Sequence, residues 1–588
     1  MGESHDSPPP GTEPAPEHIP AEDWAAANRY LDLTLGHEFS RENVLAAVRG
    51  GTHLVRTAGS WLPAVKALKA ARTHRIGDHL TGALDPSLDG KIAQDLLGYL
   101  RHVAEEGVHM GYTAARNRVR AKPHASAASN QKEAYEKTWD DAREGRVLLC
   151  FSDTPGLEGV IASPQGRVEK QNPDRTLSGE GRFVTDMRGP NTGCSKEAHP
   201  PALQPRHREV AREVLWWQAR CPRVPVLLAK RDVKAAFKLI WLRVEDVGLM
   251  TIELLGSWLG TQTDHPPDVC ALFLSMNFGW NGAPGEWMAW GNALKQYTEA
   301  HRPGEAHYND TVSYHAYVLM DDGVLVEPRL GVRPWAASAT FEQGLSLLLG
   351  RDALNVKKLA EEGTFDTKAL LWGLGYDTEA GTCQLPEQKL LKGAHLLTEP
   401  CFDPGNRAIP LLEIQRLRGN ATYWTTCQPS LRPELGAIDV LLAQQQPGDP
   451  YVCPKGNPDQ VTAAYQEFWD SVEVIRVLVT RPETWEATFT VGLEGLLNPR
   501  DRLALPGAAE RVLWVGGDAT LEIAAATDWG AKVYITFPVE PYLATLREFT
   551  GTPGDDATII SVAELMLAQP SRCSVSHVGR ASGPLRHG

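Results

Sequence analysis

Two short apolar runs that each end at aspartate constrain the fold of this 588-residue chain most strongly. The run 226–229 is followed by Asp232, and the run 314–320 is followed by Asp321 and Asp322. Apolar runs of this length indicate buried strands, and an acid at the end of such a strand can face a cleft. Each acid also has a simpler interpretation. Asp232 could cap a helix, and the Asp-Gly pair after the second run is the preferred sequence of a tight hairpin turn between two strands.

Adjacent carboxylates after a hydrophobic strand repel each other unless a cation lies near them. Together, Asp232 and Asp321 could hold a pair of divalent ions, as two-metal phosphoryl transfer requires. One ion then activates an attacking 3′-hydroxyl, and the other neutralises a triphosphate and the leaving pyrophosphate. Carboxylates without neighbouring His or Cys favour Mg²⁺ over zinc. The sequence therefore predicts two Mg²⁺ ions, with Mn²⁺ as an alternative, at these acids.

Six segments, in order, resemble the motifs of reverse transcriptases. GRFVTDMRGPN matches the fingers pattern RxxxDxRxxN, and the residues in register are Arg182, Asp186, Arg188 and Asn191. RDVKAAF, FGWNGAPGEW and LMDDG resemble palm motifs A, B and C, while NVKK and LWGLGYDTE resemble motif D and the primer-grip motif E. The resemblance implies an RNA-directed DNA polymerase with an α+β right-hand fold of fingers, palm and thumb. In such a fold Asp186, Arg188 and Asn191 would brace the fingers hairpin.

The resemblance also implies roles for the charged residues of these motifs. Asp232 and Asp321 would be the main metal ligands, and Asp322 would be an accessory acid. Arg182 would pair with the incoming triphosphate, because a planar guanidinium can bind phosphate oxygens through two hydrogen bonds. Lys358 would protonate or neutralise the leaving pyrophosphate.

Four further residues are expected around the nucleotide. Lys170 is a weaker candidate for a phosphate contact, and Gly279 would let template or nucleotide approach the backbone closely. Phe237 stands where reverse transcriptases place an aromatic ring against the sugar, and such a ring excludes a 2′-hydroxyl. It could instead be a core residue on an amphipathic turn. Leu319 departs from the family pattern, which usually has Tyr there, and this puts efficiency and fidelity in doubt.

Among reverse transcriptases, the chain is most similar to retrotransposon enzymes of the DIRS-like type, through FGWNGAPG and IPLLEIQRLRGNATYW. Near the C-terminus, WVGGDAT resembles the first strand of an RNase H domain, with Asp518 as its leading metal ligand. ISVAELMLA resembles the helix that carries the second acid, Glu564. Because no Asp or Glu follows Glu564, we expect a truncated RNase H-like domain without cleavage activity. The alternative is an unrelated small α/β tail.

Changes in composition and residue pattern along the chain predict five regions. They are an acidic, Pro-rich, disordered leader (1–25), a helical N-terminal region (26–125), the fingers and palm (130–400), a helical thumb or connection (401–500) and the partial RNase H-like domain (501–588). The leader holds six prolines and six acids but no Lys or Arg, so it buries too little apolar surface to fold. The chain has neither a long apolar run nor a secretion signal, and its nine cysteines are scattered. We therefore expect a cytoplasmic or nuclear protein with no membrane contact.

The formal net charge of −14 argues against a general nucleic-acid coat. Between residues 160 and 250, however, 16 Lys and Arg stand against 10 Asp and Glu, which is the local balance that a template–primer requires. The expected partners are an RNA template, a DNA primer and deoxynucleoside triphosphates, and nothing in the sequence predicts an oligomeric state.

Two other functions are alternatives to the polymerase. A decayed or domesticated retroelement protein would bind nucleic acid without polymerising, and Leu319 and the incomplete C-terminal domain favour it. An RNA-dependent RNA polymerase would share the palm chemistry, but Phe237 argues against it.

Overall fold

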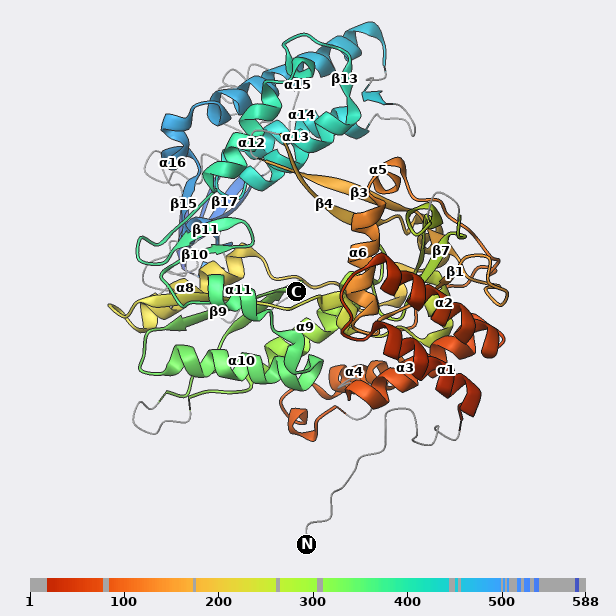
Figure 1. Cartoon of the computed structure of the whole chain (residues 1–588). Helices are drawn as coiled ribbons and strands as arrows, with labels where there is room; N and C mark the ends of the chain where they lie inside the picture. The colour runs from red at the N-terminus through yellow and green to blue at the C-terminus, as the bar shows by residue number, and fades with distance from the viewer. Residues whose placement is uncertain are drawn as a thin grey trace. The chain divides into compact units, whose positions relative to one another are not determined.

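The computed structural model of the chain contains both helices and strands and divides into two compact units (Figure 1). The first unit comprises Met1–Val214 with Arg223–Leu496, and the second comprises Leu215–Pro222 with Leu497–Gly588. The structure describes residues 18–77, 84–172, 176–260, 265–303, 310–443, 450–452, 456–498, 501–502 and 505–506, and the backbone of four strands between 515 and 580. The mixture of helices and strands that the sequence predicts is confirmed.

Helices build the N-terminal part of the first unit. They are α1 (Ala21–Thr34), α2 (Arg41–Thr57), α3 (Trp61–Ile76), α4 (Gln94–Glu106), α5 (Ala125–Ala128) and α6 (Gln131–Ala142). Helix α2 begins after Ser40, whose hydroxyl accepts a hydrogen bond from the Asn43 N–H. The buried Tyr30 hydroxyl of α1 donates to the Val147 carbonyl, which fixes the helices to the first strand.

Two predicted boundaries in this region do not coincide with the ends of helices. The predicted leader 1–25 overlaps α1, which starts at Ala21 because Trp24 is buried in the core; residues 1–17 lie outside the described part. The helical region predicted up to residue 125 stops earlier, since α4 ends at Glu106. Gly107 follows with φ of +87°, and a Cβ there would lie 2.5 Å from the Leu242 backbone, so the chain leaves the helix where it meets another segment.

Three sheets follow along the chain. The first has the order β1 (Val147–Phe151), β7 (Val269–Phe273), β6 (Thr251–Leu254) and β2 (Ala162–Ser163). The second is the hairpin of β3 (Gln165–Gln171) and β4 (Leu177–Thr185). The third has the order β5 (Val226–Asp232), β9 (Asp322–Pro328) and β8 (Ala316–Leu319), and all its neighbours are antiparallel.

The three-stranded sheet β5-β9-β8 packs on two long helices, α9 (Ala283–Glu299) and α10 (Arg333–Leu349). Figure 1 shows these helices beside β9. Strand β9 is buried along nearly its whole length, as expected of a strand that helices cover. One apolar core joins α9 and this sheet to the N-terminal helices and to β1, β6 and β7. Two short elements complete this region, α7 (Arg188–Gly193) and α11 (Val356–Glu362), and helix α8 (His207–Arg220) begins in the first unit.

The predicted hairpin between the run 314–320 and the strand that follows it has its turn in a different place. The sequence predicts a turn at Asp321, Asp322 and Gly323, but Asp322 is already paired with Leu319 and opens β9. Met320 and Asp321 form the turn, and Met320 adopts the left-handed conformation with φ of +51°. Tertiary pairing of β9 with β5 sets this register, and it overrides the local preference of Asp-Gly for a turn.

The rest of the first unit combines a small sheet with a helical layer. The sheet has the order β10 (Lys368–Leu371), β11 (Leu374–Asp377), β12 (Thr382–Gln384) and β15 (Thr490–Gly492). The helices are α12 (Glu387–Leu397), α13 (Leu411–Trp424), α14 (Arg432–Ala443), α15 (Pro458–Val479) and α16 (Trp485–Thr488), with a short pair β13 (Ile409–Pro410) and β14 (Tyr451–Val452). Helix α15 begins with a capping box between Asn457 and Gln460.

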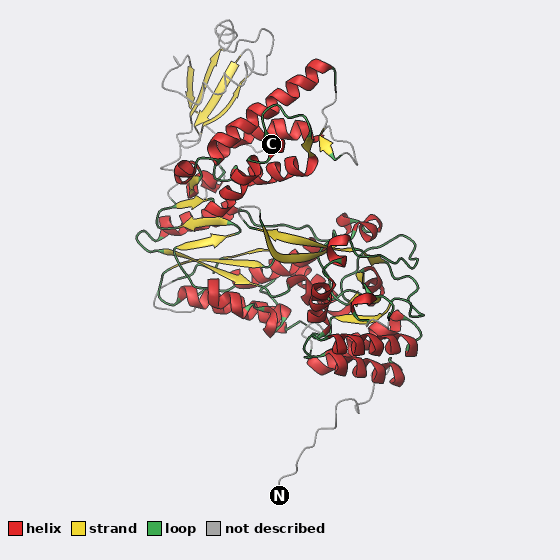
Figure 2. Cartoon of the chain, turned by 45° about the horizontal axis from the view of Figure 1, so that its top comes forward, coloured by secondary structure: helices red, strands yellow, loops and turns green. Residues whose placement is uncertain are grey.

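Besides the end of α8, the described part of the second unit contains an antiparallel sheet, and Figure 2 draws strands in yellow. Its strands run in the order β16 (Val515–Ala519), β17 (Ile523–Asp528), β18 (Val533–Pro538) and β19 (His577–Arg580). Asp518 lies on β16 opposite Ala525, on the strand that the sequence predicts. Glu564 and its predicted helix lie outside the described residues. Of the helices that the structure describes, none combines the length and the apolar character needed to cross a membrane.

Candidate functional site

The three predicted acids lie at one end of the sheet β5-β9-β8. Asp232 is the last residue of β5 and is paired directly with Asp322, the first residue of β9. Directly paired residues of antiparallel neighbours project from the same face of a sheet, so these two carboxylates share a face. Asp321 lies in the adjoining turn, and its carbonyl accepts a hydrogen bond from the Val233 N–H at 2.8 Å. Acids from two separate sequence motifs are thus brought together.

Lys358 contacts the first of these acids. Its Nζ lies 2.5 Å from Asp232 Oδ1, and Asn355 Nδ2 donates to Asp232 Oδ2 at 2.7 Å. Asn355 also caps α11, because its side-chain oxygen accepts from the Lys358 N–H. The hydrogen bond to Asp232, aided by the charges of Asp322 and Asp321, raises the pKa of Lys358. The ammonium group therefore stays protonated beside the acids.

The negative charge at this site is only partly balanced. Burial raises the pKa of Asp322, the charges of Asp321 and Asp232 raise it further, and Lys230 and Lys358 oppose the rise. A carboxylate in such surroundings gains from a further cation, and aspartate oxygens are the hard ligands that Mg²⁺ prefers. Among the described residues, no three His, Cys, Asp or Glu side chains converge closely enough to hold an ion. The donor chemistry fits Mg²⁺, but an ion at Asp232 would have to replace the contact with Lys358.

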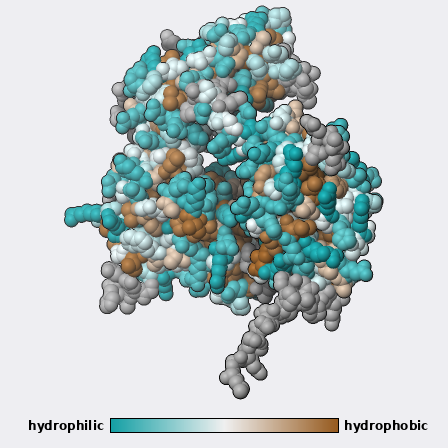
Figure 3. All heavy atoms as spheres, in the orientation of Figure 1, coloured by the Kyte–Doolittle hydropathy of each residue, from teal (hydrophilic) through white to brown (hydrophobic). Residues whose placement is uncertain are grey.

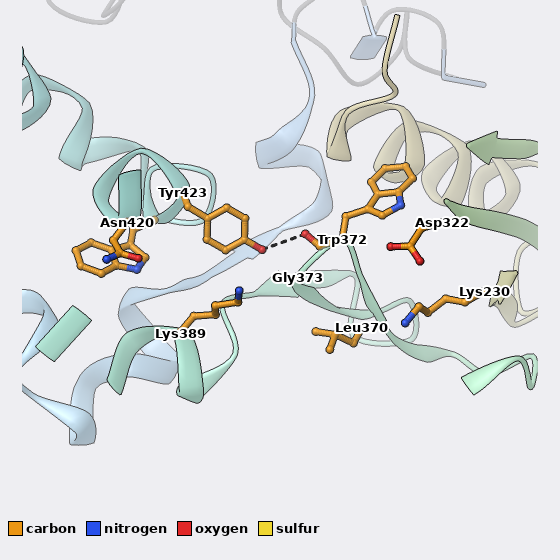
Figure 4. Close-up of a pocket in the computed structure, with 9 residues that line it drawn as sticks. Lys230, Asp322, Leu370, Trp372, Gly373, Lys389, Asn420 and Tyr423 are labelled. Carbon is orange, nitrogen blue, oxygen red and sulfur yellow. Dashed lines mark hydrogen bonds between the residues drawn. The ribbon is translucent and has the colours of Figure 1, made fainter. Parts of the chain in front are cut away.

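A cavity of about 370 Å³ opens beside Asp322 (Figure 4). Its lining residues come from β5, β9, β10, the turn between β10 and β11, α12 and α13, and they are Lys230, Asp322, Leu370, Trp372, Gly373, Lys389, Asn420, Tyr423 and Trp424. Trp372 and Gly373 both have positive φ, and the Tyr423 hydroxyl donates to the Trp372 carbonyl at 3.2 Å. Two lysines among aromatic rings give this cavity the chemistry to hold a phosphate-linked chain with bases.

The sequence did not identify the contributions of α12 and α13 to this cavity. Lys389, Asn420 and Tyr423 belong to segments that read as ordinary amphipathic helices, and Asn420 and Tyr423 lie in the segment that resembles DIRS-like enzymes. The Lys389 ammonium lies 5.9 Å from the centroid of the Tyr423 ring, which is cation–π range. Only the packing of the helical layer near the small sheet brings these residues to the acids.

The predicted phosphate-binding residues lie on the hairpin β3-β4. The Arg182 side chain is exposed on β4 and has no ion pair with any described residue. Lys170 instead pairs with Glu180 across the hairpin, at 2.6 Å, and both side chains are exposed. Val168 lies directly opposite Arg182, so an apolar and a cationic side chain share an exposed face. Seen in the orientation of Figure 1, the molecular surface in Figure 3 is mainly hydrophilic, with separate apolar patches.

The loop that contains Gly279 is braced by the fingers motif. Asn191 Nδ2 donates to the Gly279 carbonyl at 2.9 Å, and the Asn281 N–H donates to Asn191 Oδ1 at 3.0 Å. Gly279 has φ of +103°, and a Cβ on it would lie 2.5 Å from the Thr185 carbonyl oxygen. Glycine is therefore required by the backbone and by the approach of Thr185. The side chain of Asn191 therefore braces this loop.

Phe237 is 6% exposed and belongs to the main apolar core. Its ring meets the ring of Phe278 edge to face at 4.7 Å, and that of Trp287 at 6.3 Å. Phe278 is 61% exposed, so it covers the outer side of Phe237. Of these rings, Phe278 is the one that a ligand would meet first. Phe237 can therefore be either a core residue or a sugar gate.

Comparison with known proteins gives a distant structural similarity. No protein-family model and no curated protein sequence matches this chain. Among solved structures, it is similar to a foamy viral protease-reverse transcriptase in complex with double-stranded DNA. The two chains are 13% identical, and the match covers 85% of this chain and 80% of the other, with a TM-score of 0.41. A function for this chain therefore has to be argued from the residues of the site and not from this similarity.

Proposed function

We propose that this chain is an RNA-directed DNA polymerase, which adds deoxynucleotides to the 3′-hydroxyl of a primer. The observation that carries the proposal is the pairing of Asp232 with Asp322 across two strands, with Asp321 in the adjoining turn. Nucleotidyl transfer needs acids that hold divalent ions at the reacting phosphate, and a cation for the departing pyrophosphate. Lys358 lies in contact with Asp232 and supplies such a cation.

Two Mg²⁺ ions, or Mn²⁺ ions, would be held by Asp232 and Asp321, with Asp322 as the accessory acid. When bound, such ions activate the primer hydroxyl and neutralise charge on the triphosphate. An ion at Asp232 would displace Lys358 from that carboxylate, and the ammonium would then be available to the β- and γ-phosphates. There it would neutralise the leaving pyrophosphate or give it a proton.

The remaining surfaces have matching roles in the proposal. The cavity beside Asp322 would receive the primer end, since its aromatic rings and lysines suit stacked bases and phosphates. Arg182, and more weakly Lys170, would contact the incoming triphosphate from the fingers, with the palm within 130–400 and the thumb within 401–500. We further propose a DIRS-like retroelement origin, an inactive RNase H-like remnant around Asp518 and Glu564, and a cytoplasmic or nuclear location.

Primer extension tests this function. Purified chain, oligo(dT) annealed to poly(rA), dTTP and Mg²⁺ are combined, and the length of the primer is followed. The proposal expects extension that depends on the template and on the divalent ion. No extension of an RNA-templated or DNA-templated primer by a folded protein, in Mg²⁺ or in Mn²⁺, would contradict it.

A second candidate function is nucleic-acid binding without polymerisation. It is favoured by the Lys358 contact with Asp232, which neutralises the acid without a metal ion. Fluorescence anisotropy with a labelled primer–template separates the two candidates. Salt-sensitive binding together with extension supports the polymerase, whereas the same binding without extension supports the alternative.

Phe237→Ala is expected to lower the discrimination between dTTP and UTP by about 10-fold, which corresponds to about 1.4 kcal/mol. Removing the ring removes the steric bar to a 2′-hydroxyl if the sugar lies against Phe237. The measurement is the ratio of kcat/KM for the two nucleotides, which does not depend on how much of the variant is folded. Phe278→Ala is measured in parallel, because Phe278 is the exposed ring of the same pair, which a ligand would meet first. Unchanged discrimination in Phe237→Ala would leave this residue as part of the core.

A further inference from the structure

Helix α9 holds the turn that carries Asp321. The indole N–H of Trp287 donates a hydrogen bond to the Met320 carbonyl at 2.8 Å. Trp287 is 1% exposed, so this hydrogen bond is shielded from water. Neither residue belongs to the set that the sequence predicts for the site. The contact joins two motifs that lie far apart in the chain.

This hydrogen bond acts on the peptide group next to Asp321. The Met320 carbonyl and the Asp321 N–H belong to one rigid planar unit, so holding the carbonyl fixes the direction of the whole peptide. The Asp321 carbonyl is held in turn by the Val233 N–H at 2.8 Å. Asp321 is therefore fixed on both sides, by Trp287 before it and by the end of β5 after it.

The turn needs such support because Met320 is left-handed, with φ of +51°. Non-glycine residues disfavour this conformation, and it persists only where the surroundings impose it. The two-residue turn has no glycine, since Gly323 lies inside β9. The buried hydrogen bond from Trp287 supplies a constraint that the local sequence lacks.

Trp287 is itself held firmly. The preceding residue, Glu286, is buried and accepts from the Tyr99 hydroxyl of α4 at 2.5 Å. His199 Nδ1 lies 2.7 Å from the other oxygen of Glu286. The first turn of α9 is thus anchored by groups from two other segments, and the Trp287 ring also lies against Phe237. A rigid donor of this kind can impose a direction on a turn.

We propose that Trp287 is a positioning residue for Asp321, which sets the direction of its carboxylate through the Met320 carbonyl. The inference rests on the proposed polymerase function and goes beyond it, because it names a residue that touches neither nucleotide nor ion. Loss of the N–H should leave nucleotide binding intact and slow the chemical step. The expected change is a fall of about 10-fold in kcat, with the KM for dTTP within about two-fold of the wild-type value.

The same helix offers a matched control. Trp290 is fully buried on α9, and its indole N–H makes no hydrogen bond with any described residue. Trp287→Phe and Trp290→Phe therefore remove the same atoms from one helix, but only the first removes a hydrogen bond to the turn. A second variant carries β-(3-benzothienyl)alanine at 287, which keeps the size of the ring system and replaces the N–H by sulfur.

The experiment combines kinetics with hydrogen exchange of the backbone amides between 316 and 326. The expected result is a lower kcat and faster exchange in both 287 variants, and wild-type values for Trp290→Phe. If the wild type extends primers and the 287 variants match it in kcat and exchange, the positioning role is overturned while the polymerase stands. If the folded wild type extends no primer, the proposed function fails, and exchange alone decides the positioning: faster exchange in the 287 variants upholds it, and unchanged exchange overturns it.

Discussion

Asp321→Asn is expected to reduce nucleotide incorporation by about 1,000-fold or more, equivalent to about 4 kcal/mol of transition-state stabilisation. Asparagine keeps the shape of the side chain but removes the charge that would hold a divalent ion. The loss of an ion removes both the activation of the primer hydroxyl and the neutralisation of the triphosphate. Single-turnover incorporation of one nucleotide measures the effect.

The same substitution should not weaken the fold. Asp321, Asp322 and Asp232 repel one another, and the charge of Asp321 contributes to the raised pKa of Asp322. Removing one charge lowers that pKa toward its usual range, so the Tm of Asp321→Asn should equal or exceed that of the wild type. Asp95→Asn, an exposed acid on α4, is the control and should retain full activity. Activity of Asp321→Asn within 10-fold of the wild type would contradict the assignment of this acid.

Arg333→Met is expected to lower the free energy of unfolding by about 3–5 kcal/mol, because it leaves a buried charge without its partner. Arg333 is 2% exposed and pairs with the fully buried Glu327 and with Asp310 at 2.7 Å. Its guanidinium also donates to the carbonyls of Val312 and Ser313. Burial raises the pKa of Glu327, and the charge of Arg333 opposes that rise. Without Arg333, the carboxyl is left as a buried anion or must take up a proton.

This network matters to the site because of where it lies. Arg333 begins α10, Glu327 lies near the end of β9, and the residues that accept from Arg333 lead into β8. The network therefore holds together the end of the β8-β9 hairpin that lies opposite the turn with Asp321. Urea or thermal unfolding measures the effect. Arg101→Met, which breaks an exposed ion pair with Asp89, is the control and should cost about 1 kcal/mol or less. A loss of similar size in both variants would show that the buried network contributes little.

The sequence indicated the acids because the signal for them is local. Short apolar runs that end in Asp232 and Asp321 predict strands with acids at their ends, and the structure brings these ends together. The position of the turn was missed because it depends on pairing across the sheet. Asp322 and Gly323 favour a turn by themselves, but β9 pairs with β5 from Asp322 onward and draws both residues into a strand.

Several contacts of the site could not be predicted from the sequence. Asn355 opens the NVKK segment, but nothing in that segment indicates that its amide binds Asp232. Trp287 ends the FGWNGAPGEW segment, and nothing there indicates that its N–H meets the turn that carries Asp321. Tyr423 reaches the cavity beside the acids from α13. Such contacts depend on how helices pack, and periodicity predicts which face of a helix is buried but not its partner.

Phe237 was predicted from a motif, and the structure bears on whether it is a sugar gate or a core residue. Its position after Asp232 suggests a ring against the nucleotide sugar, yet it is nearly buried and is covered by Phe278. Sequence position alone does not distinguish a core ring from a gate, because both need a large apolar side chain at the same place. Discrimination between nucleotides distinguishes them.

Addition of a single dTMP to an oligo(dT) primer on poly(rA), by the wild type and by Asp321→Asn in parallel, decides whether the chain is a polymerase that uses these acids. We expect a primer one nucleotide longer with the wild type in Mg²⁺, no product when Mg²⁺ is chelated, and a rate about 1,000-fold lower with Asp321→Asn. A folded wild type that binds the primer–template without extending it, or extension that survives Asp321→Asn unchanged, would show that the chain is not such a polymerase.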